Sequence, residues 1–422
     1  MSVLSILFQD LSARLCSSEF LSDARHPDHP AAFSRCRKLP LPALVAIMLT
    51  GMRMSVQSEL DTFFAHLAQQ AQLMHKVSEQ AFAKARAKLS LTAIPLLNDW
   101  LITRAERDGF VPRWCALRLV AADASTVRFG LRASHVKRAA LADQILFGLF
   151  LPGPDLMLAA SLHSAGERGE RQFLVEHLDR LSPTDLLLLD RGYPCRWLVA
   201  LLNHRAIKFC MRVDQSEAGF GCVREFVLSG ESERIVMLRA PDKQDALDYE
   251  CPRKPQRVRL VRHIAPNGEQ RVLMTNLFDE KRYPASSFGE LYHQRWSIEE
   301  AFKRLKHRLN LEHVTGLSQQ AVVQDVAAKI VCDNLQALTA YTAHADGELP
   351  DSERINHAYA HTALKPLLPI LLLGGKVSRK VGKMLRTLLD LISGRTYRHR
   401  ENVSKPRKQG RKPHKSNTQK NC

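Results

Sequence analysis

The stretch that decides the fold of this chain is Tyr292-His-Gln-Arg-Trp-Ser-Ile-Glu-Glu-Ala-Phe-Lys-Arg-Leu-Lys306. Because an α-helix turns by about 100° per residue, it gathers a phenol, two cations and a carboxylate on one stripe roughly 60° wide. These side chains are Tyr292, Arg295, Glu299 and Lys306. An apolar stripe between Ile298 and Leu309 lies directly beside them, so the helix is predicted to pack against a core and to present a polar site. Glu299 suits a hard cation, and Arg295 and Lys306 suit phosphate oxygens; a solvated helix face is the alternative.

Two aspartates stand at the ends of apolar runs that are typical of buried strands. The run Leu117–Asp123 precedes polar residues 124–126, which predicts a strand that ends in a turn with Asp123 at its edge. In the run Asp185–Asp190, glycine and proline follow, which predicts that Asp190 lies at the carboxyl end of a strand. Ligands in open α/β sheets gather at strand ends, so both are candidate site residues, with a turn or helix cap as the alternative role. Asp185 is the weaker candidate because it begins the strand.

The order of elements between these runs is also informative. Residues 144–151 and 155–162 favour two strands joined by a Pro-Gly-Pro turn, which predicts a hairpin. Apolar periodicity over Arg171–Leu181 predicts a helix. The resulting succession of three strands, a helix and a strand resembles the ribonuclease-H-like fold. In that fold the first and fourth strands bring their carboxylates side by side and a later helix supplies a third, which implies that Asp123, Asp190 and Glu299 converge.

The block that begins at Tyr292, written Tyr-x2-Arg-x3-Glu-x6-Lys, resembles the signature of bacterial transposases of insertion-sequence family four, in the Asp-Asp-Glu class. The resemblance covers roughly residues 75–335 and includes the Asp123 turn, Asp190-Arg-Gly-Tyr193 and Thr275-Asn-Leu277. It implies metal-dependent cleavage of double-stranded DNA at terminal inverted repeats, through a hairpin intermediate. It also implies cut-and-paste strand transfer into target DNA by a homodimer.

The residue types favour metal-assisted phosphoryl transfer on DNA. We expect two Mg²⁺ ions about 3.5 to 4 Å apart, for which Mn²⁺ can substitute, held by three catalytic and metal-ligating side chains. These are Asp123, Asp190 and Glu299. The expected phosphate-binding side chains are Tyr292, Arg295, Lys306 and Arg191.

The complete fold prediction is an α/β protein with a ribonuclease-H-like catalytic core, a mixed sheet with flanking helices. Strand-like runs between residues 205 and 285, separated by polar loops, predict that a mostly β insertion interrupts this core. Helical periodicity dominates both terminal regions. The predicted domains are 1–105, a helical DNA-binding region; 106–204, the first part of the core; 205–288, the insertion; 289–342, the second part with the catalytic helix; 343–394, a helical C-terminal region; and 395–422, a basic disordered tail.

The net charge agrees with a nucleic-acid partner. The chain has 61 Lys plus Arg against 43 Asp plus Glu, giving a formal charge of +18. Much of this charge lies in the tail, whose lack of large apolar residues predicts disorder. On a predicted helix over Ser78–Leu89, the side chains of Gln80, Lys84 and Lys88 align within about 80°, a face that suits a DNA major groove. An ordinary surface helix is the alternative.

The sequence also bears on the compartment. Nine scattered cysteines without a Cys-x-x-Cys pair favour reduced thiols. The apolar stretches are too short to span a bilayer, and polar residues interrupt the first apolar segment, which argues against a signal peptide. We therefore expect a cytoplasmic bacterial protein associated with the nucleoid and without a membrane partner.

Two alternatives belong to other classes of protein. A tyrosine-type recombinase would use Tyr292 as a covalent nucleophile and would work without a divalent metal. A domesticated or inactive transposase-derived protein would bind DNA without cleaving it. Sensitivity to a chelator separates the first alternative from the metal-dependent mechanism.

Overall fold

The computed structural model describes residues 2–35, 37–129, 139–166, 169–265, 268–350, 352–374 and 379–398. The chain divides into two compact units. The helical unit comprises Met1–Phe110, Thr126–Gln144 and Lys303–Cys422, and the sheet unit comprises Val111–Ser125 and Ile145–Phe302. A mixed sheet and numerous helices are present, so the α/β class predicted from the sequence is confirmed.

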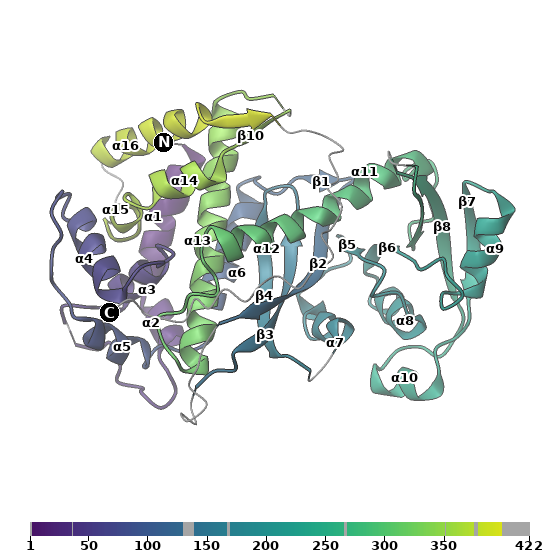
Figure 1. The fold of residues 1–422 in the computed structure, drawn as a ribbon, viewed down its shortest axis with the longest axis horizontal. Helices are drawn as coiled ribbons and strands as arrows, with labels where there is room; N and C mark the ends of the chain where they lie inside the picture. Colours follow the sequence, from purple (N-terminus) through teal and green to yellow (C-terminus); the bar gives the residue numbers. More distant parts are fainter. Residues whose placement is uncertain are drawn as a thin grey trace. The chain divides into compact units, whose positions relative to one another are not determined.

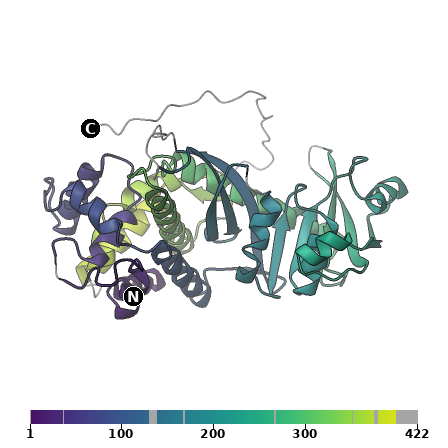
Figure 2. The same cartoon turned by 90° about the horizontal axis from the view of Figure 1, so that it is seen from below.

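A mixed sheet dominates the sheet unit (Figure 1). Its strands are β1 (Arg113–Trp114), β2 (Leu117–Arg128), β3 (Asp143–Leu151), β4 (Leu156–Ser164), β5 (Asp185–Leu189), β6 (Lys208–Arg212), β7 (Glu233–Leu238), β8 (Gln256–Ile264) and β9 (Gln270–Thr275). The order is β4-β3-β2-β5-β6-β9-β8-β7, with β1 paired to β2. Strand β5 is parallel to β2 and β6, whereas β6, β9, β8 and β7 pair antiparallel in turn. The strands can also be followed from below in Figure 2.

Strand β5 lies in the interior of the sheet, and its four leucine side chains make it apolar on both faces. All five residues of Asp185–Leu189 are buried, as expected for a parallel strand covered on both sides. Its first residue, Asp185, pairs in register with Arg118 of β2. The Arg118 Nε and Nη2 atoms donate to the two Asp185 carboxylate oxygens at 2.6 and 2.7 Å. Asp185 therefore has a structural partner, and Asp190 follows directly at the end of the strand.

The predicted end of β2 is wrong. We expected a turn at residues 124–126, but the strand continues through Asp123 to Arg128. The residues from Asp123 to Ser125 are half-buried, whereas the preceding Val120–Ala122 are fully buried. A strand with one less buried side accommodates polar residues, so the polar run did not signal a turn. Asp123 thus lies inside a strand rather than after one.

The predicted hairpin and helix between these strands are present. Strands β3 and β4 are neighbours in the sheet, and α7 (Glu170–Val175) follows them. The predicted helix over Arg171–Leu181 is shorter than expected, because a 3₁₀ turn, η1 (Leu178–Arg180), replaces its second half. The succession of three strands, a helix and a strand is confirmed.

Residues 205–288 contain the four predicted strands, β6 to β9, which extend the same sheet. Two helices in this segment were not predicted: α9 (Gly221–Ser229) and α10 (Lys243–Asp248). Helix α9 packs against β7 through a face that contains the buried Val223 and Phe226. Helix α8 (Arg196–His204) precedes β6 and packs against it.

The signature stretch is helical, but it is not one α-helix. It consists of α11 (Phe288–His293), a 3₁₀ turn η3 (Gln294–Trp296) and α12 (Ser297–His307), which follow one another in Figure 1. The prediction of a single regular helix is therefore wrong at its centre, where the backbone tightens to i→i+3 bonding. The predicted apolar stripe is confirmed, because its members Ile298, Ala301, Phe302, Leu305 and Leu309 are all buried.

The helical unit is built around one long buried helix. Its helices are α1 (Val3–Leu15), α2 (Ser18–Ala24), α3 (Leu41–Met48), α4 (Val56–Leu67), α5 (Glu79–Arg86), α6 (Ala93–Arg107), α13 (Gln319–Asp346), α14 (His357–Leu364), α15 (Leu368–Leu373) and α16 (Arg379–Ser393). Helix α13 packs against α6, α14 and α16 (Figure 1). Its burial on most sides is expected for a helix that is largely apolar all round. Ser55 and Ser78 cap the starts of α4 and α5, since their hydroxyls accept from backbone amides.

The start of the predicted tail is ordered. Thr396–Arg398 forms β11, which pairs antiparallel with β10 (Glu353–Ile355). The expectation of disorder from Arg395 onward is therefore wrong for these residues, and the rest of the predicted basic tail, residues 399–422, lies outside the described residues.

Two further expectations concern thiols and membranes. The described cysteines are all free thiols, in agreement with the prediction of reduced cysteines. Among the helices that the structure describes, none combines the length and the apolar character needed to cross a bilayer.

Candidate active site

Arg295 joins two of the three predicted acids. Its Nη2 donates to Glu299 Oε1 at 2.7 Å, and its Nη1 lies 3.6 Å from Asp123 Oδ2. The Arg295 residue is only 5% exposed, so these contacts are shielded from solvent. Asp123 comes from β2 and Glu299 from the first turn of α12. One guanidinium thus brings together side chains that are far apart in the sequence.

Asp190 belongs to the same cluster. It follows β5, the parallel neighbour of β2, and its Oδ1 accepts from the Gly192 amide at 2.7 Å. The negative charges of Asp190 and Glu299 both act on Asp123. Asp190 and Glu299 therefore both lie within electrostatic range of Asp123.

The electrostatics of this cluster favour an added positive charge. Burial, followed by the charges of Glu299 and Asp190, raises the pKa of Asp123 to about 6. Arg295 and a hydrogen bond from the Ala124 amide act in the opposite direction. Burial is the largest of these effects, so the pKa of Asp123 stays raised even though Arg295 acts more strongly than either neighbouring carboxylate.

Tyr292 lies beside this cluster but is enclosed. It is 3% exposed, and the Arg295 guanidinium lies 6.0 Å from the centre of its ring. Burial raises the pKa of the Tyr292 phenol well above its usual range, while Arg295 acts against this. The phenol is therefore protonated at neutral pH and can donate a hydrogen bond.

Two other predicted phosphate-binding residues have different surroundings. Lys306 lies in the helical unit, where its Nζ donates to the Thr126 carbonyl at 2.6 Å. Arg191 is exposed in the turn after Asp190. Hydrogen bonds from Ser216 lower the pKa of Asp214, and the charge of Arg191 adds a smaller effect in the same direction. Lys306 thus binds the backbone near the end of β2, and Arg191 presents its guanidinium to solvent.

The predicted DNA-reading face near the N-terminus is only partly present. Gln80 and Lys84 are exposed on α5, but the helix ends at Arg86, so Lys88 lies beyond it. The prediction of three side chains on one helix is therefore wrong for Lys88. Helix α5 buries Phe82 and Arg86, whereas Ala81 is exposed.

Sequence reasoning missed Glu170 and Tyr193. Glu170 begins α7, and Asp123 and Asp190 act on its charge. The Tyr193 hydroxyl is buried and faces the same carboxylates. Tyr193 stands in the Asp190-Arg-Gly-Tyr motif, which was a signal for it. The only sequence signal for Glu170 was its position as an acidic residue in a run of alternating charges.

The carboxylates do not form a ready-made metal site as they stand. In the part of the chain that the structure describes, no three Asp, Glu, His or Cys side chains are close enough together to hold one ion. The donor chemistry nevertheless fits a hard divalent cation, because the groups concerned are carboxylate oxygen donors whose charged forms are disfavoured without an added cation. Arg295 stands between two of them, so binding of an ion requires these side chains to shift.

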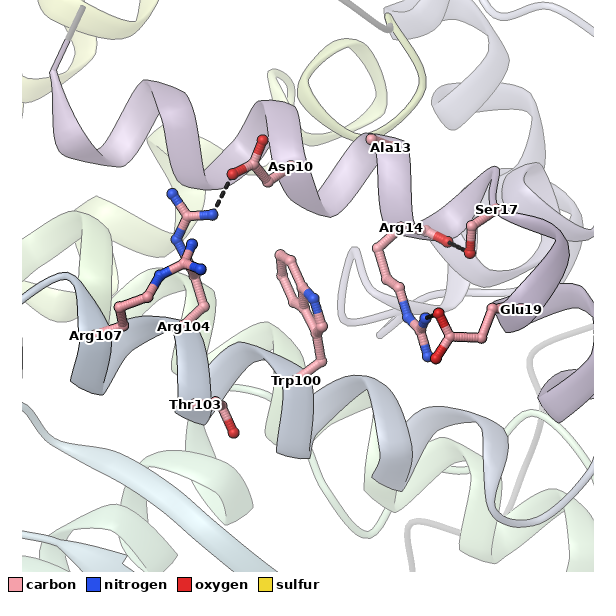
Figure 3. Close-up of a pocket in the computed structure, with 9 residues that line it drawn as sticks. All are labelled: Asp10, Ala13, Arg14, Ser17, Glu19, Trp100, Thr103, Arg104 and Arg107. Atoms are coloured by element: carbon pink, nitrogen blue, oxygen red, sulfur yellow. Dashed lines mark hydrogen bonds and ion pairs between the residues drawn. The ribbon is translucent and has the colours of Figure 1, made fainter.

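A pocket of about 570 Å³ in the helical unit is not part of this cluster. Figure 3 shows the Trp100 indole between α1 and α6, with arginines on both sides. Arg104 is paired with Asp10 and Asp108, and Arg14 with Glu19. Because acidic partners neutralise these cations, the pocket lacks the charge and the carboxylate cluster expected of the predicted chemistry.

Comparison with known proteins identifies the family. The family model described as "Transposase DDE domain" matches residues 116–335, which include the three clustered acids. The chain belongs to this family, and the resemblance inferred from the Tyr292 block is confirmed.

A curated relative extends this finding. The chain is 24% identical over 246 residues to "Transposase InsG for insertion sequence element IS4" of Escherichia coli (strain K12). The match covers 53% of this chain and 52% of that protein, so the chain spans about half the length of the curated relative that it matches. A cryo-EM structure of a piggyBac transposase synaptic complex with hairpin DNA is similar with a TM-score of 0.41 and 10% identity, covering 92% of this chain and 85% of that chain.

Proposed function

We propose that this protein is a DNA transposase that cleaves terminal inverted repeats and joins them to target DNA by a cut-and-paste mechanism. The observation that carries the proposal is the Arg295 bridge between Asp123 and Glu299, with Asp190 acting on the same carboxylates. Membership of the transposase DDE-domain family supports this assignment. The substrates are double-stranded DNA ends and a DNA target.

Asp123, Asp190 and Glu299 would hold the divalent cations, two Mg²⁺ ions for which Mn²⁺ substitutes. When bound, such ions lower the pKa of an attacking water or hydroxyl and stabilise the leaving oxygen of an in-line displacement. The surroundings of Asp123 support this role, because burial, together with the charges of Glu299 and Asp190, disfavours its charged form, although Arg295 acts against them. Arg295 holds two of these carboxylates in place until an ion binds.

The cationic and phenolic side chains would handle the phosphodiester. Arg295 has the bidentate geometry that suits a phosphate once it is released from Glu299. The protonated Tyr292 phenol donates a hydrogen bond that orients a phosphate oxygen. Lys306 and Arg191 bind the flanking DNA backbone, and the exposed Gln80 and Lys84 contact the transposon end.

The organisation of the chain follows from this function. We propose a ribonuclease-H-like core over 106–204 and 289–342, with the insertion over 205–288 against the DNA. Residues 1–105 bind transposon ends, residues 343–394 form a helical C-terminal region, and the basic tail contacts DNA phosphates. The active complex is a homodimer at the bacterial nucleoid in the cytoplasm.

A tyrosine-recombinase mechanism is disfavoured by the surroundings of Tyr292. A phenol nucleophile is activated by a lowered pKa. Burial instead raises the pKa of Tyr292. This observation favours the metal-dependent mechanism.

The test compares neighbouring glutamates on α12. Glu299→Gln is expected to abolish nicking of labelled terminal-repeat DNA while a gel shift still detects binding, and Asp123→Asn should behave in the same way. Glu300→Gln, an identical change at an exposed adjacent position, is the matched control and should retain cleavage. Added EDTA should stop cleavage by the wild type. Equal nicking by Glu299→Gln and Glu300→Gln would refute the assignment, whereas binding without cleavage by the wild type would favour an inactive DNA-binding descendant.

A further inference from the structure

Glu170 is a fourth acidic side chain beside the candidate active site. It begins α7, and its neighbour Arg171 donates from Nε to the Gly192 carbonyl at 3.0 Å. The Gly192 amide in turn donates to Asp190 Oδ1 at 2.7 Å. The start of α7 is therefore tied to the turn that holds Asp190, and Glu170 and Gly192 line the same pocket.

Charge effects agree with this placement. Burial, followed by the charges of Asp123 and Asp190, raises the pKa of Glu170 to about 6. All three causes oppose the charged form of Glu170, whereas a surface glutamate has no such opposition. Glu170 therefore lies within electrostatic reach of two proposed cation ligands, in surroundings that favour an additional positive charge.

The second observation is an unsatisfied hydroxyl. Tyr193 is 0% exposed, and its hydroxyl has no hydrogen-bond partner among the described residues. The charges of Glu170, Asp123 and Asp190 all act on this phenol, with Arg295 opposing them, so the hydroxyl lies within electrostatic range of these carboxylates. A buried donor without a partner is unfavourable, which points to a partner that joins the cluster when the site is filled.

An open pocket of about 420 Å³ adjoins these groups, and Glu170, Arg171 and Gly192 form part of its wall. Trp197 and Tyr249 line it as well, stacked with ring centroids 3.6 Å apart. Glu170 therefore borders an opening on the side of α7.

We propose that Glu170 is a further oxygen ligand of the divalent-cation site, and that the Tyr193 hydroxyl donates a hydrogen bond to an oxygen atom held there. This inference rests on the proposed function, because it assumes that Asp123 and Asp190 hold a cation. It adds a fourth carboxylate to those of Asp123, Asp190 and Glu299. It also assigns a positioning role to the Tyr193 hydroxyl.

The test measures binding of Mn²⁺ to the full chain without DNA, by the loss of the free-ion electron paramagnetic resonance signal. Glu170→Gln is expected to weaken Mn²⁺ binding about tenfold. Tyr193→Phe, which removes only the hydroxyl, should weaken it by a smaller factor. Glu176→Gln makes the same chemical change at the C-cap of the same helix and should bind as the wild type does.

Thermal unfolding in EDTA separates a folding defect from a binding defect. Because Glu170→Gln removes one of several repelling carboxylates, its midpoint in EDTA should equal or exceed that of the wild type, while its stabilisation by Mn²⁺ should shrink. If Glu170→Gln binds Mn²⁺ as tightly as Glu176→Gln while Asp123→Asn binds weakly, the role of Glu170 is refuted and the proposed function stands. If the wild type and Asp123→Asn bind Mn²⁺ equally, the cation site itself is refuted.

Discussion

The guanidinium of Arg295 lies 2.7 Å from Glu299 Oε1, within one turn of helical backbone. The same group contacts Asp123, so its removal leaves two partly buried carboxylates facing each other. We expect Arg295→Gln to lower the free energy of unfolding by about 2–4 kcal/mol, measured by urea denaturation in EDTA. Lys303→Gln, at an exposed position on the same helix, should change it by less than about 0.5 kcal/mol.

The loss of stability caused by Arg295→Gln should also depend on divalent cations. If Arg295 compensates the carboxylates in the ion-free protein, Mg²⁺ should stabilise the variant more than the wild type. Equal stabilisation of both proteins by Mg²⁺ would contradict the view that the guanidinium and the cation serve the same carboxylates.

Lys84 tests the proposed DNA-reading role of α5. Replacing this exposed lysine with glutamine should weaken binding to terminal-repeat DNA and reduce the slope of log K against log salt by about 1, because one phosphate contact is lost. Fluorescence anisotropy at several salt concentrations measures both quantities. Lys243→Gln, at an exposed position of the sheet unit, is the control for nonspecific loss of charge. An unchanged slope for Lys84→Gln would place the DNA elsewhere.

His361 predicts a dependence of stability on pH. Burial, then the charges of Arg53 and Lys365, lowers its pKa from 6.5 to about 4, with Glu59 opposing and Arg308 adding to the decrease. Between these two values the unfolded chain binds a proton that the folded protein does not, so stability is lost as the pH falls from 6.5 towards 4. The loss amounts to about 3 kcal/mol over this window.

The measurement is urea unfolding of the wild type and His361→Gln at several pH values in this window. The variant should lose less stability on acidification than the wild type, because glutamine does not titrate. Parallel pH profiles for the two proteins would show that His361 carries no part of the acid sensitivity.

Gly51 tests packing in the helical unit. Its φ of +66° is in the left-handed region, and an added Cβ would lie 3.0 Å from both Cys332 Sγ and Leu309 Cδ2. Gly51→Ala should therefore destabilise the protein by about 2–4 kcal/mol through strain and overpacking together. Gly109 has a φ of +82° but nothing within 4 Å of an added Cβ, so Gly109→Ala should lower the free energy of unfolding by only about 1 kcal/mol. Equal losses in denaturant midpoint would show that crowding at Gly51 is absent.

The sequence predicted the elements that depend on local pattern. Continuous leucines identified β5, and the apolar stripe from Ile298 to Leu309 identified the inward side of α12, because burial imposes these periodicities directly. The prediction was wrong where a pattern had two physical causes. Polar residues after Asp123 suit a turn and equally suit a half-buried strand, so only tertiary pairing decides between them.

Other features depended on contacts that no local pattern encodes. Arg86 reads as a cation on an exposed helix, but it is buried and pairs with Asp325 of α13 at 2.8 Å. Glu170 gains its surroundings from β2 and from the turn after β5, which are distant in the sequence. Asp123, Asp190 and Glu299 became candidates because the motifs around them are unusual together. Glu170 is a lone acid in a charged run and gave no comparable signal.

Because β2 continues through Asp123, the three acids differ in how freely their side chains can move. Asp123 is carried within a strand, and Asp190 is held at the end of the adjacent parallel strand by the Gly192 amide. Glu299 instead has a longer side chain on a helix, restrained through Arg295. The sheet therefore fixes the positions of Asp123 and Asp190, whereas Glu299 can adjust. We expect the rotamer of Glu299 to change when the three carboxylates move closer together.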